Sequence, residues 1–528
     1  MVINNMSTNI QLIDFYYILA ECWLVFTIVF SLLSIAKFDL TQNSTLVTKK
    51  TIIAGHIRKI CLSGINQLIL LLIIPIWIIL DTLYHCPMES VDFVDVSTGY
   101  FGFNQHMAAD LYTLFFKLLI AITISIILAA SDRYLLKHSR PLMEFPIIVL
   151  IMTFFLFVLV SAQDLIVAFI AIVGFSLNIY VLILNDSNNQ SSREAAIKYY
   201  YLSAFSSGLI AFGIWIAYLV CLNTNFINIA WILQVWDFKE QNGLLSVMLY
   251  FIIFGLFFKL AAFPCHLWAA AVYEGSPQPV TALFILPIKI AVLGFFFKLL
   301  TVVFKDLYHV WSFIIWLSSI TSMLFGSLSA LVEKKVKKFI AYSSISQMGF
   351  LLIGLSVGTF DGLRSSIVYL IIYIVMNIGL FIILLNTYNI YTNRSLTFLT
   401  DFHYFAKSNW LTSIALIIIL FSMAGIPPLG GFFGKYYLFL TAFNANYFSL
   451  VVIGMFASIV STFYYLRIIK FLWFERQHRV NVGFITTLSF TARYTLYSVE
   501  TLLLIFFLLS NPFFIVVDLI VYCCLTNN

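Results

Sequence analysis

Residues 411–435 read LTSIALIIILFSMAGIPPLGGFFGK, an apolar run that is interrupted by Pro427 and Pro428 and then reaches a lysine, Lys435. Proline removes a backbone hydrogen-bond donor and clashes with the preceding turn, so a helix does not continue through this pair. Inside a membrane, the freed backbone groups are tolerated only where protein or water satisfies them. The stretch therefore predicts a broken membrane helix that lines a cavity.

A second apolar run is interrupted in a related way. It extends from Leu244 to Pro264, and Lys259 lies five residues before that proline, whereas Lys435 lies seven residues after Pro428. Charge and break thus occur in opposite order along the chain. This order favours two inverted five-helix repeats, because a unit with an odd number of spans turns the next unit upside down.

The composition is that of a polytopic membrane protein. Hydrophobic residues make up 62% of the 528 residues, charged residues only 10%, and the mean hydropathy is +1.01. Apolar runs of about 20 residues recur from end to end and predict an all-α fold of about fourteen transmembrane helices. The first run, 12–36, has no cleavage site after it and reads as a retained helix, and the last is expected over 494–521. The predicted divisions are 1–144 for helices 1–3, 145–308 for the first repeat (helices 4–8), 309–475 for the second repeat (helices 9–13) and 476–528 for helix 14.

The charges in the predicted loops alternate along the chain. Basic residues gather after the odd-numbered spans, whereas the second span is followed by an acidic loop with Asp81, Glu89, Asp92 and Asp95. Since basic loops stay on the inner side of a membrane, both termini are predicted to lie on the outer side. This asymmetry also explains the net charge of +6, so no nucleic-acid partner is needed.

Motifs for redox and nucleotide chemistry are missing from the sequence. The seven cysteines form no CxxC pair and no cluster with histidine at the spacing of metal ligands. We find no GxGxxG, GxxxxGK[ST] or GxSxG motif either. Any redox chemistry is therefore expected on other chains.

Three lysines lie where a membrane helix ordinarily excludes charge: Lys259, Lys289 and Lys435. Each ammonium at the centre of a bilayer costs roughly 2.5–3.5 kcal/mol on insertion scales. Intramembrane lysines usually face the protein interior and mark ion or proton pathways. The sequence therefore favours proton or ion handling over a purely structural role for these three residues.

Two further residues are candidates on weaker grounds. Lys198 follows a capping-box pattern at Ser191 and Glu194 that begins the sixth helix, so it lies near the membrane interface. It either belongs to a proton path or pairs with Glu194, one helical turn before it. His266, two residues after Pro264, either satisfies freed backbone groups or relays protons, and the nearby Lys259 favours the relay.

Other polar residues have plainer interpretations. Lys117 and Lys298 lie near predicted helix ends, where a long side chain reaches the membrane surface, a behaviour called snorkelling. The basic run 334–338 is expected to be a solvated loop. Tyr464 and Tyr465 are expected to pack or to anchor a helix at the interface, in preference to forming a quinone site.

Several stretches resemble one protein family. HLWAAAVYEGSPQPVTALF (266–284), FIAYSSISQMGF (339–350) and SMAGIPPLGGFFGKYYLF (422–439) resemble the antiporter-like membrane subunits of proton-translocating NADH:quinone oxidoreductase, respiratory complex I, and especially its chain 2 family. The resemblance runs from about 107 to about 471. It implies a fourteen-helix membrane-arm subunit with no cofactor of its own. NADH, FMN, iron–sulfur clusters and ubiquinone are then expected on other subunits of the complex, and those subunits and the lipid bilayer are the expected partners.

The resemblance also assigns roles to residues. The lysines of the sixth, seventh, eighth and twelfth spans of the family match Lys198, Lys259, Lys289 and Lys435, and the histidine after the first break matches His266. These residues are expected to form a proton-transfer chain in which Lys259 holds the central proton, His266 and Lys289 relay it and Lys435 passes it outward.

One position departs from the family pattern. The family carries a glutamate in the fifth span, and the matching residue here is Val173. That carboxylate is thought to pair with the lysine of the sixth span, so Lys198 needs another partner, and Glu194 is the nearest by sequence. A chain without the glutamate is either a working proton translocator or a scaffold that has lost pumping.

Alternatives remain at this point. A cation/proton antiporter subunit would have the same lysines and helix breaks. Phe (54) and Tyr (28) each outnumber Gly (23). This bias is expected of AT-rich coding, which is found in many mitochondrial genomes. The inner mitochondrial membrane is therefore the favoured location, with a bacterial plasma membrane as the alternative.

Overall fold

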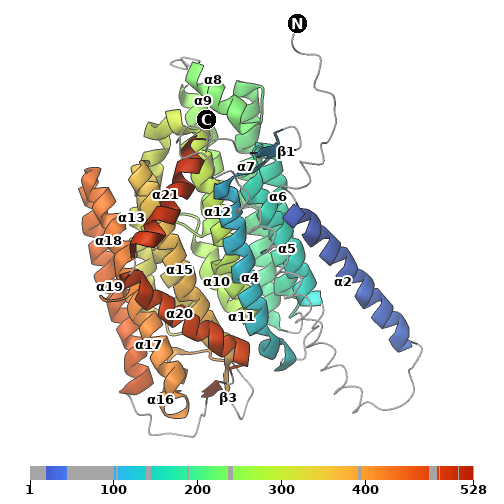
Figure 1. The fold of residues 1–528 in the computed structure, drawn as a ribbon, viewed down its shortest axis with the longest axis vertical. Coiled ribbons are helices and arrows are strands. Elements are labelled where there is room, and N and C mark those ends of the chain that lie inside the picture. Colours follow the sequence, from blue (N-terminus) through green and yellow to red (C-terminus); the bar gives the residue numbers. More distant parts are fainter. Residues whose placement is uncertain are drawn as a thin grey trace.

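The computed structural model describes residues 19–43, 76, 100–102, 105–137, 144–186, 189–235, 242–389, 395–403, 405–474, 484–486, 488–508 and 510–526. These residues form a bundle of long helices, with the helices of the first half beside those of the second half (Figure 1). Two short helices at the end of the chain, drawn in red, lie across one face of the bundle. The C-terminal end lies at the same end of the bundle as α8.

The elements up to the middle of the chain are mostly long apolar helices. They are α2 (Leu19–Asn43), β1 (Tyr100–Gly102), β2 (Met107–Ala109), α4 (Leu111–Lys137), α5 (Glu144–Ser161), α6 (Leu165–Leu184), α7 (Gln190–Cys221), α8 (Phe226–Val235), α9 (Asn242–Leu260), α10 (Leu267–Gly275), α11 (Gln278–Ile285) and α12 (Pro287–Lys298).

The second half continues in the same style. It consists of η1 (Leu299–Val303), η2 (Lys305–Leu307), α13 (Tyr308–Val332), α14 (Val336–Val357), α15 (Phe360–Asn386), β3 (Thr387–Asn389), η3 (Leu399–Phe402), α16 (Phe405–Ser408), α17 (Trp410–Ala424), α18 (Gly430–Asn444), α19 (Phe448–Trp473), β4 (Phe484–Thr486), α20 (Phe490–Leu508) and α21 (Ser510–Thr526). The strands form two short antiparallel pairs, β1 with β2 and β3 with β4.

Ten helices within the described ranges are long and apolar enough to cross a membrane, or eleven if the bent pair α20 and α21 is one span. The prediction of an all-α polytopic fold is confirmed. The count of about fourteen stays a prediction, because most of 44–99, where the second span was expected, lies outside the described residues.

Both predicted helix breaks are present. The α9 helix ends at Leu260 and α10 begins at Leu267, with Ala261 in the left-handed region at φ 57°. The α17 helix ends at Ala424 and α18 begins at Gly430. Gly425 has φ 87°, a conformation that favours glycine. Its N–H caps the end of α17 by donating to carbonyls of the last turn.

The end of the chain differs from the prediction. One helix was expected over 494–521, but α20 and α21 meet at an angle of 92°. Pro512 lies in the first turn of α21, where its missing N–H is tolerated. Pro512 is compatible with the start of a helix but not with its interior. This explains why α20 and α21 replace one continuous helix.

The centre of the bundle is formed by α12, α14 and α15. The span 278–303 is buried along its whole length, and the spans of α14 and α15 are 94% and 89% buried. By contrast, only 33% of the span of α7 is buried, so α7 lies at the edge. A lysine on α12 is therefore surrounded by protein, whereas one on α7 can face lipid or a partner.

Candidate proton-transfer site

Lys435 lies at the second helix break. Its ammonium donates hydrogen bonds to the carbonyl oxygens of Met423 and Ala424, both at 3.0 Å, and lies 5.0 Å from the ring centroid of Phe350. These carbonyls belong to the last turn of α17, whose partial negative charge favours a cation. The break thus leaves two acceptors unused by the helix, and Lys435 from the second half-helix occupies both.

Close packing holds this geometry. A Cβ on Gly431 would lie 1.8 Å from the carbonyl oxygen of Ser422, so only glycine lets α18 approach α17 at this point. A Cβ on Gly434 would lie 2.5 Å from the ring of Tyr369. The glycines around Lys435 therefore set the distance between the two half-helices and their neighbour α15.

Lys259 lies at the first break in a different environment. Its side chain is buried, its Nζ has no hydrogen-bond partner, and the nearest aromatic centroids, those of Phe175 and Phe258, are each 5.7 Å away. The carbonyl of Phe258, freed by the break, accepts instead from the indole of Trp268 at 3.1 Å and from the N–H of Ala261. The carbonyl of Phe258 is thus used by other donors, and the ammonium of Lys259 is left beside aromatic rings.

Lys289 lies in the centre of the molecule. It follows the kink at Leu286, between α11 and α12, and is 1% exposed. Its Nζ is 3.5 Å from the carbonyl oxygen of Ser344 on α14. Since Lys435 contacts Phe350 on the same helix, α14 lies between the two lysines, with contact points six residues or about 9 Å apart along its axis.

A polar group that the sequence interpretation missed fills this interval. Gln347 lies on α14 between the two contact points, accepts a hydrogen bond from Tyr369 of α15, and its side chain also contacts the hydroxyl of Tyr465. Tyr373, one turn along α15, has its hydroxyl 3.5 Å from the carbonyl of Ile285, just before the α12 kink. The run of serines with Gln347 inside an apolar helix is the signal that could have revealed this group.

His266 lies at the first helix break, directly before α10. It is buried between two aromatic rings, with centroid distances of 5.3 Å to Phe263 and 5.7 Å to Phe325. Its Nδ1 has no hydrogen-bond partner. None of its contacts among the described residues is with Lys259 or Lys289, so its predicted relay role stays a prediction.

Lys198 and Glu194 do not belong to the buried group. Both are exposed on the outer face of α7, and no ion pair joins them in the described part of the chain. The pairing of Lys198 with Glu194 therefore stays a prediction. Val173 is half-buried on α6, and Phe175 of the same helix has its ring centroid 5.7 Å from the Lys259 ammonium.

The snorkelling prediction is wrong for both lysines to which it was applied. Lys117 is 1% exposed and forms an ion pair with the buried Glu21 of α2. Lys298 is 5% exposed and donates to the carbonyl oxygen of Ala162 at 3.3 Å. Neighbouring helices cover both positions, so the side chains find acceptors inside the protein instead of at the membrane surface.

The basic run 334–338 also differs from the expected solvated loop. Lys335 and Lys338 form ion pairs with Glu274 at the end of α10, and Lys337 donates to the carbonyl of Ser276 at 2.6 Å. Partial burial alone would raise the pKa of Glu274, but the hydrogen bonds from Lys335 and Lys338 outweigh it and hold that pKa below its ordinary value. The run therefore clamps the second half of the first broken helix.

The two tyrosines combine ring packing with polar contacts, since the hydroxyl of Tyr464 lies 3.5 Å from that of Ser346 and Tyr465 contacts the side chains of Gln347 and Ser343. Tyr464 and Tyr465 are fully buried, with ring centroids 4.5 Å apart, and both contact the ring of Phe339. Within the described residues, no group of three or more histidine, cysteine, aspartate or glutamate side chains is placed to hold a metal ion.

Comparisons with known proteins agree with this arrangement. The family model for "NADH:quinone oxidoreductase/Mrp antiporter, TM" matches residues 162–461, which contain both helix breaks and the lysines Lys259, Lys289 and Lys435. The chain belongs to this family. Its fold is also that of a chain in respiratory complex I from Thermus thermophilus, with a TM-score of 0.69 at 22% identity over 88% of this chain and 96% of that one.

Curated relatives include subunits of bacterial and plant complexes. The chain is 37% identical over 378 residues to NADH-quinone oxidoreductase subunit N of Rhodospirillum rubrum, covering 72% of this chain and 77% of the relative. It is 35% identical over 374 residues to NADH-ubiquinone oxidoreductase chain 2 of Marchantia polymorpha, covering 70% and 75%. The resemblance stated from the sequence motifs is confirmed.

Proposed function

We propose that this chain is an antiporter-like subunit in the membrane arm of a proton-translocating NADH:quinone oxidoreductase. The observation that carries the proposal is the burial of Lys259, Lys289 and Lys435 in apolar helices, with Lys259 and Lys435 at the helix breaks. The names of the relatives from Rhodospirillum rubrum and Marchantia polymorpha support extending that role to this chain.

In this proposal the chain moves protons and other subunits move electrons. NADH, FMN, iron–sulfur clusters and ubiquinone are bound elsewhere in the complex, and electron transfer there shifts buried charge along the membrane arm. The partners of this chain are then neighbouring membrane-arm subunits and the lipid bilayer. The exposed side chains of Lys198 and Glu194 on α7 fit a face that meets such a neighbour.

The buried lysines supply an order of proton transfer. Lys259 holds the central proton, because its ammonium has no fixed hydrogen bond to break. Lys289 and then Lys435 receive it by way of the polar group at Gln347 and Tyr369. His266 relays the proton together with Lys289, and Lys198, which is exposed on α7, acts at the face toward a neighbouring subunit. Water at the helix breaks connects these groups, since interrupted backbone inside a membrane needs protein or water partners.

The inverted repeats are part of the same proposal. We assign α5, α6, α7, α9 with α10, and α11 with α12 to one unit, and α13, α14, α15, α17 with α18, and α19 to the other. Corresponding pairs pack together in both units, such as α5 with α6 and α13 with α14, or α7 with α10 and α15 with α18. This correspondence supports the predicted divisions 145–308 and 309–475.

The location follows from the composition and from the relatives. The aromatic-rich, glycine-poor composition and the plant chain 2 relative favour the inner mitochondrial membrane. The bacterial relatives keep a bacterial plasma membrane as the alternative.

Two other functions have an observation in their favour. A free-standing cation/proton antiporter subunit is favoured by the family model, which includes Mrp antiporters. A scaffold that has lost pumping is favoured by Val173, which leaves α6 without the acidic side chain of the family at that position.

The test of the proposal is co-migration. Source membranes are solubilised gently, intact complexes are separated by native electrophoresis, and peptides of this chain are sought by mass spectrometry in the band with NADH:quinone reductase activity. The proposal expects the chain in that band. Its migration apart from the activity would contradict the proposal and favour the antiporter.

A further inference from the structure

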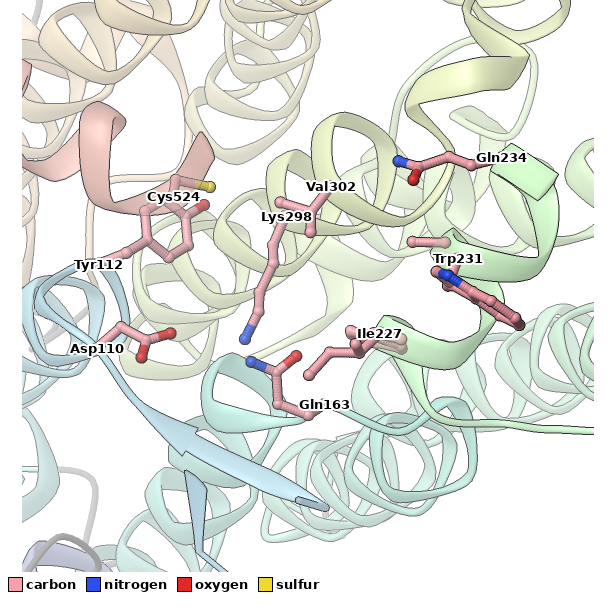
Figure 2. A pocket seen from close by; sticks show the side chains of 11 residues that line it. Asp110, Tyr112, Gln163, Ile227, Trp231, Gln234, Lys298, Val302 and Cys524 are labelled. Carbon is pink, nitrogen blue, oxygen red and sulfur yellow. The ribbon is translucent and has the colours of Figure 1, made fainter. Parts of the chain in front are cut away.

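A pocket outside the three-lysine group carries a second set of polar side chains. It lies between α8 and the end of α12, has a cavity volume of about 120 Å³, and also receives the start of α4 and the end of α21 (Figure 2). Its polar lining residues are Asp110, Tyr112, Gln163, Gln234, Lys298 and Cys524.

The base of the pocket is buried and charged. Asp110 and Lys298 are each 5% exposed, and Figure 2 shows the ammonium of Lys298 pointing toward the gap between the Asp110 carboxylate and the Gln163 amide. Within the described residues the two charges form no direct ion pair, and Oδ1 of Asp110 has no hydrogen-bond partner. A buried carboxylate oxygen without a partner is costly unless water or a proton satisfies it.

Local structure explains why this oxygen is free. Asp110 directly precedes α4, where an aspartate usually caps the helix with its carboxylate. Here the hydroxyl of Thr113 accepts from the Asp110 N–H at 2.9 Å and donates to its carbonyl. The carboxylate is thereby left to point into the pocket.

The mouth of the pocket is open. Trp231 on α8 is 61% exposed and Gln234 is exposed beside it. The α8 helix follows the sixth predicted span, which ends on the outer side by the loop-charge rule. The pocket therefore runs from a buried acid and ammonium to the outer surface, and its volume accommodates several water molecules.

Further charges continue inward from the base. Lys117 on α4 lies seven residues, or about two helical turns, after Asp110 and on the same face. It forms an ion pair with Glu21. On α12, Lys298 lies nine residues after Lys289, which places the two lysines on opposite faces of that helix. The other titratable groups around the pocket are Tyr112, Cys524 and, next to Gln163, the His106–Asp164 pair at 2.9 Å.

We propose that this pocket is a hydrated proton outlet in which Asp110 and Lys298 exchange a proton through water and release it to the outer side past Gln234. This inference rests on the proposed function and adds a second polar route to it. The step transfers one proton from the Lys298 ammonium through water to the free Asp110 oxygen, and then from that carboxyl to water at the mouth. No electron moves and no covalent bond other than O–H and N–H changes.

The first test asks whether water reaches the base from outside. A small membrane-impermeant thiol reagent is added to the outer face of sealed membranes that contain the intact complex, and labelling of each cysteine is quantified by peptide mass spectrometry. Cys524 lines the pocket and is expected to react, whereas Cys221, which is equally buried but does not line the pocket, is not. Absence of labelling at Cys524, or labelling only from the inner side, would overturn the outlet.

The second test measures function. Asp110→Asn and Lys298→Met are introduced into the intact complex, and NADH oxidation and proton translocation are measured in sealed vesicles. The expected result is fewer protons released per NADH oxidised than in wild type, because each variant removes a proton-transfer group. Asp306→Asn and Lys305→Met make the same chemical changes at exposed sites just beyond α12 and are expected to behave as wild type.

Lys259→Met is measured alongside to separate the two proposals. If it lowers proton translocation and the pocket variants do not, the outlet is refuted and the proposed function stands. If only the pocket variants lower it, the lysine route fails instead. Ala230→Phe fills the pocket without removing a buried charge, and it is expected to slow proton release. It is measured in place of any charge variant whose complex fails to assemble.

Discussion

At the scale of single residues, the three lysines differ in what their ammonium groups contact. Lys435 is held by two carbonyls, Lys289 contacts one at 3.5 Å, and Lys259 has none. A proton carrier works best when its protonated and neutral forms are close in free energy, whereas a fixed hydrogen-bond set favours one form. The gradation from Lys259 to Lys435 therefore suits transfer in that direction.

Gln347 is predicted to matter because it lies between Lys289 and Lys435. We expect Gln347→Leu to lower proton translocation by about tenfold, since it removes the amide that Tyr369 contacts and interrupts the polar group between Lys289 and Lys435. Initial rates of vesicle acidification per NADH oxidised measure this. Met348→Leu, a volume-conserving change at the next residue of α14, is the control. Equal rates for Gln347→Leu and wild type would remove Gln347 from the route.

Residue-level reasoning from sequence succeeded for the lysines and failed for their surroundings. Lys259, Lys289 and Lys435 are recognisable because charge inside an apolar run has few structural explanations. Lys117 and Lys298 look similar in sequence to snorkelling lysines, and only the partners Glu21 and Ala162, distant along the chain, reveal that they are buried.

At the scale of elements, the two broken helices are related but not equivalent. In the second break a lysine of the later half-helix bonds the end of the earlier one, whereas in the first break the indole of Trp268 takes a freed carbonyl. The position of each break was predictable, because proline ends a helix for a local reason. The partner of each freed carbonyl was not, since it depends on how the half-helices pack.

Gly431→Ala is predicted to disturb the second break. The added Cβ would lie 1.8 Å from the carbonyl oxygen of Ser422, so α17 and α18 must separate. We expect a loss of stability of about 1–3 kcal/mol, the usual range for overpacking. Thermal unfolding of the solubilised complex, followed by native electrophoresis, measures it. Gly208→Ala, where no atom lies within 4 Å of the added Cβ, is the matched control. A Gly431→Ala complex as stable as the Gly208→Ala complex would contradict the close approach.

At the scale of the whole molecule, α14 joins the proposed repeats. It contacts α10 of the first unit and α15 and α18 of the second, and the run 334–338 that precedes and begins it clamps Glu274. The first broken helix is therefore tied by ion pairs to the helix whose residues contact Lys289 and Lys435. Sequence alone indicated two units, but not this contact between them, because Glu274 and Lys335 are separated by 61 residues.

The clamp at Glu274 is predicted to depend on pH. Because ion pairs with lysine lower its pKa, Glu274 contributes stability above its ordinary pKa of 4.5, and this contribution is lost as the pH falls through the lower value in the folded protein. Partial exposure limits the effect to about 1 kcal/mol. We expect Glu274→Gln to lower thermal stability at neutral pH and to have no effect once wild-type Glu274 is protonated. An equal loss at both pH values would rule out the ion pairs as its cause.

The account rests on the claim that the buried lysines of this chain carry protons. The most direct measurement is the number of protons translocated per NADH oxidised by the intact complex with Lys259→Met and Lys435→Met together, after native electrophoresis has shown normal assembly. The account predicts a lower number of protons per NADH, while exposed Lys305→Met leaves it unchanged. A wild-type number in the assembled double variant would contradict the account and identify the chain as a scaffold.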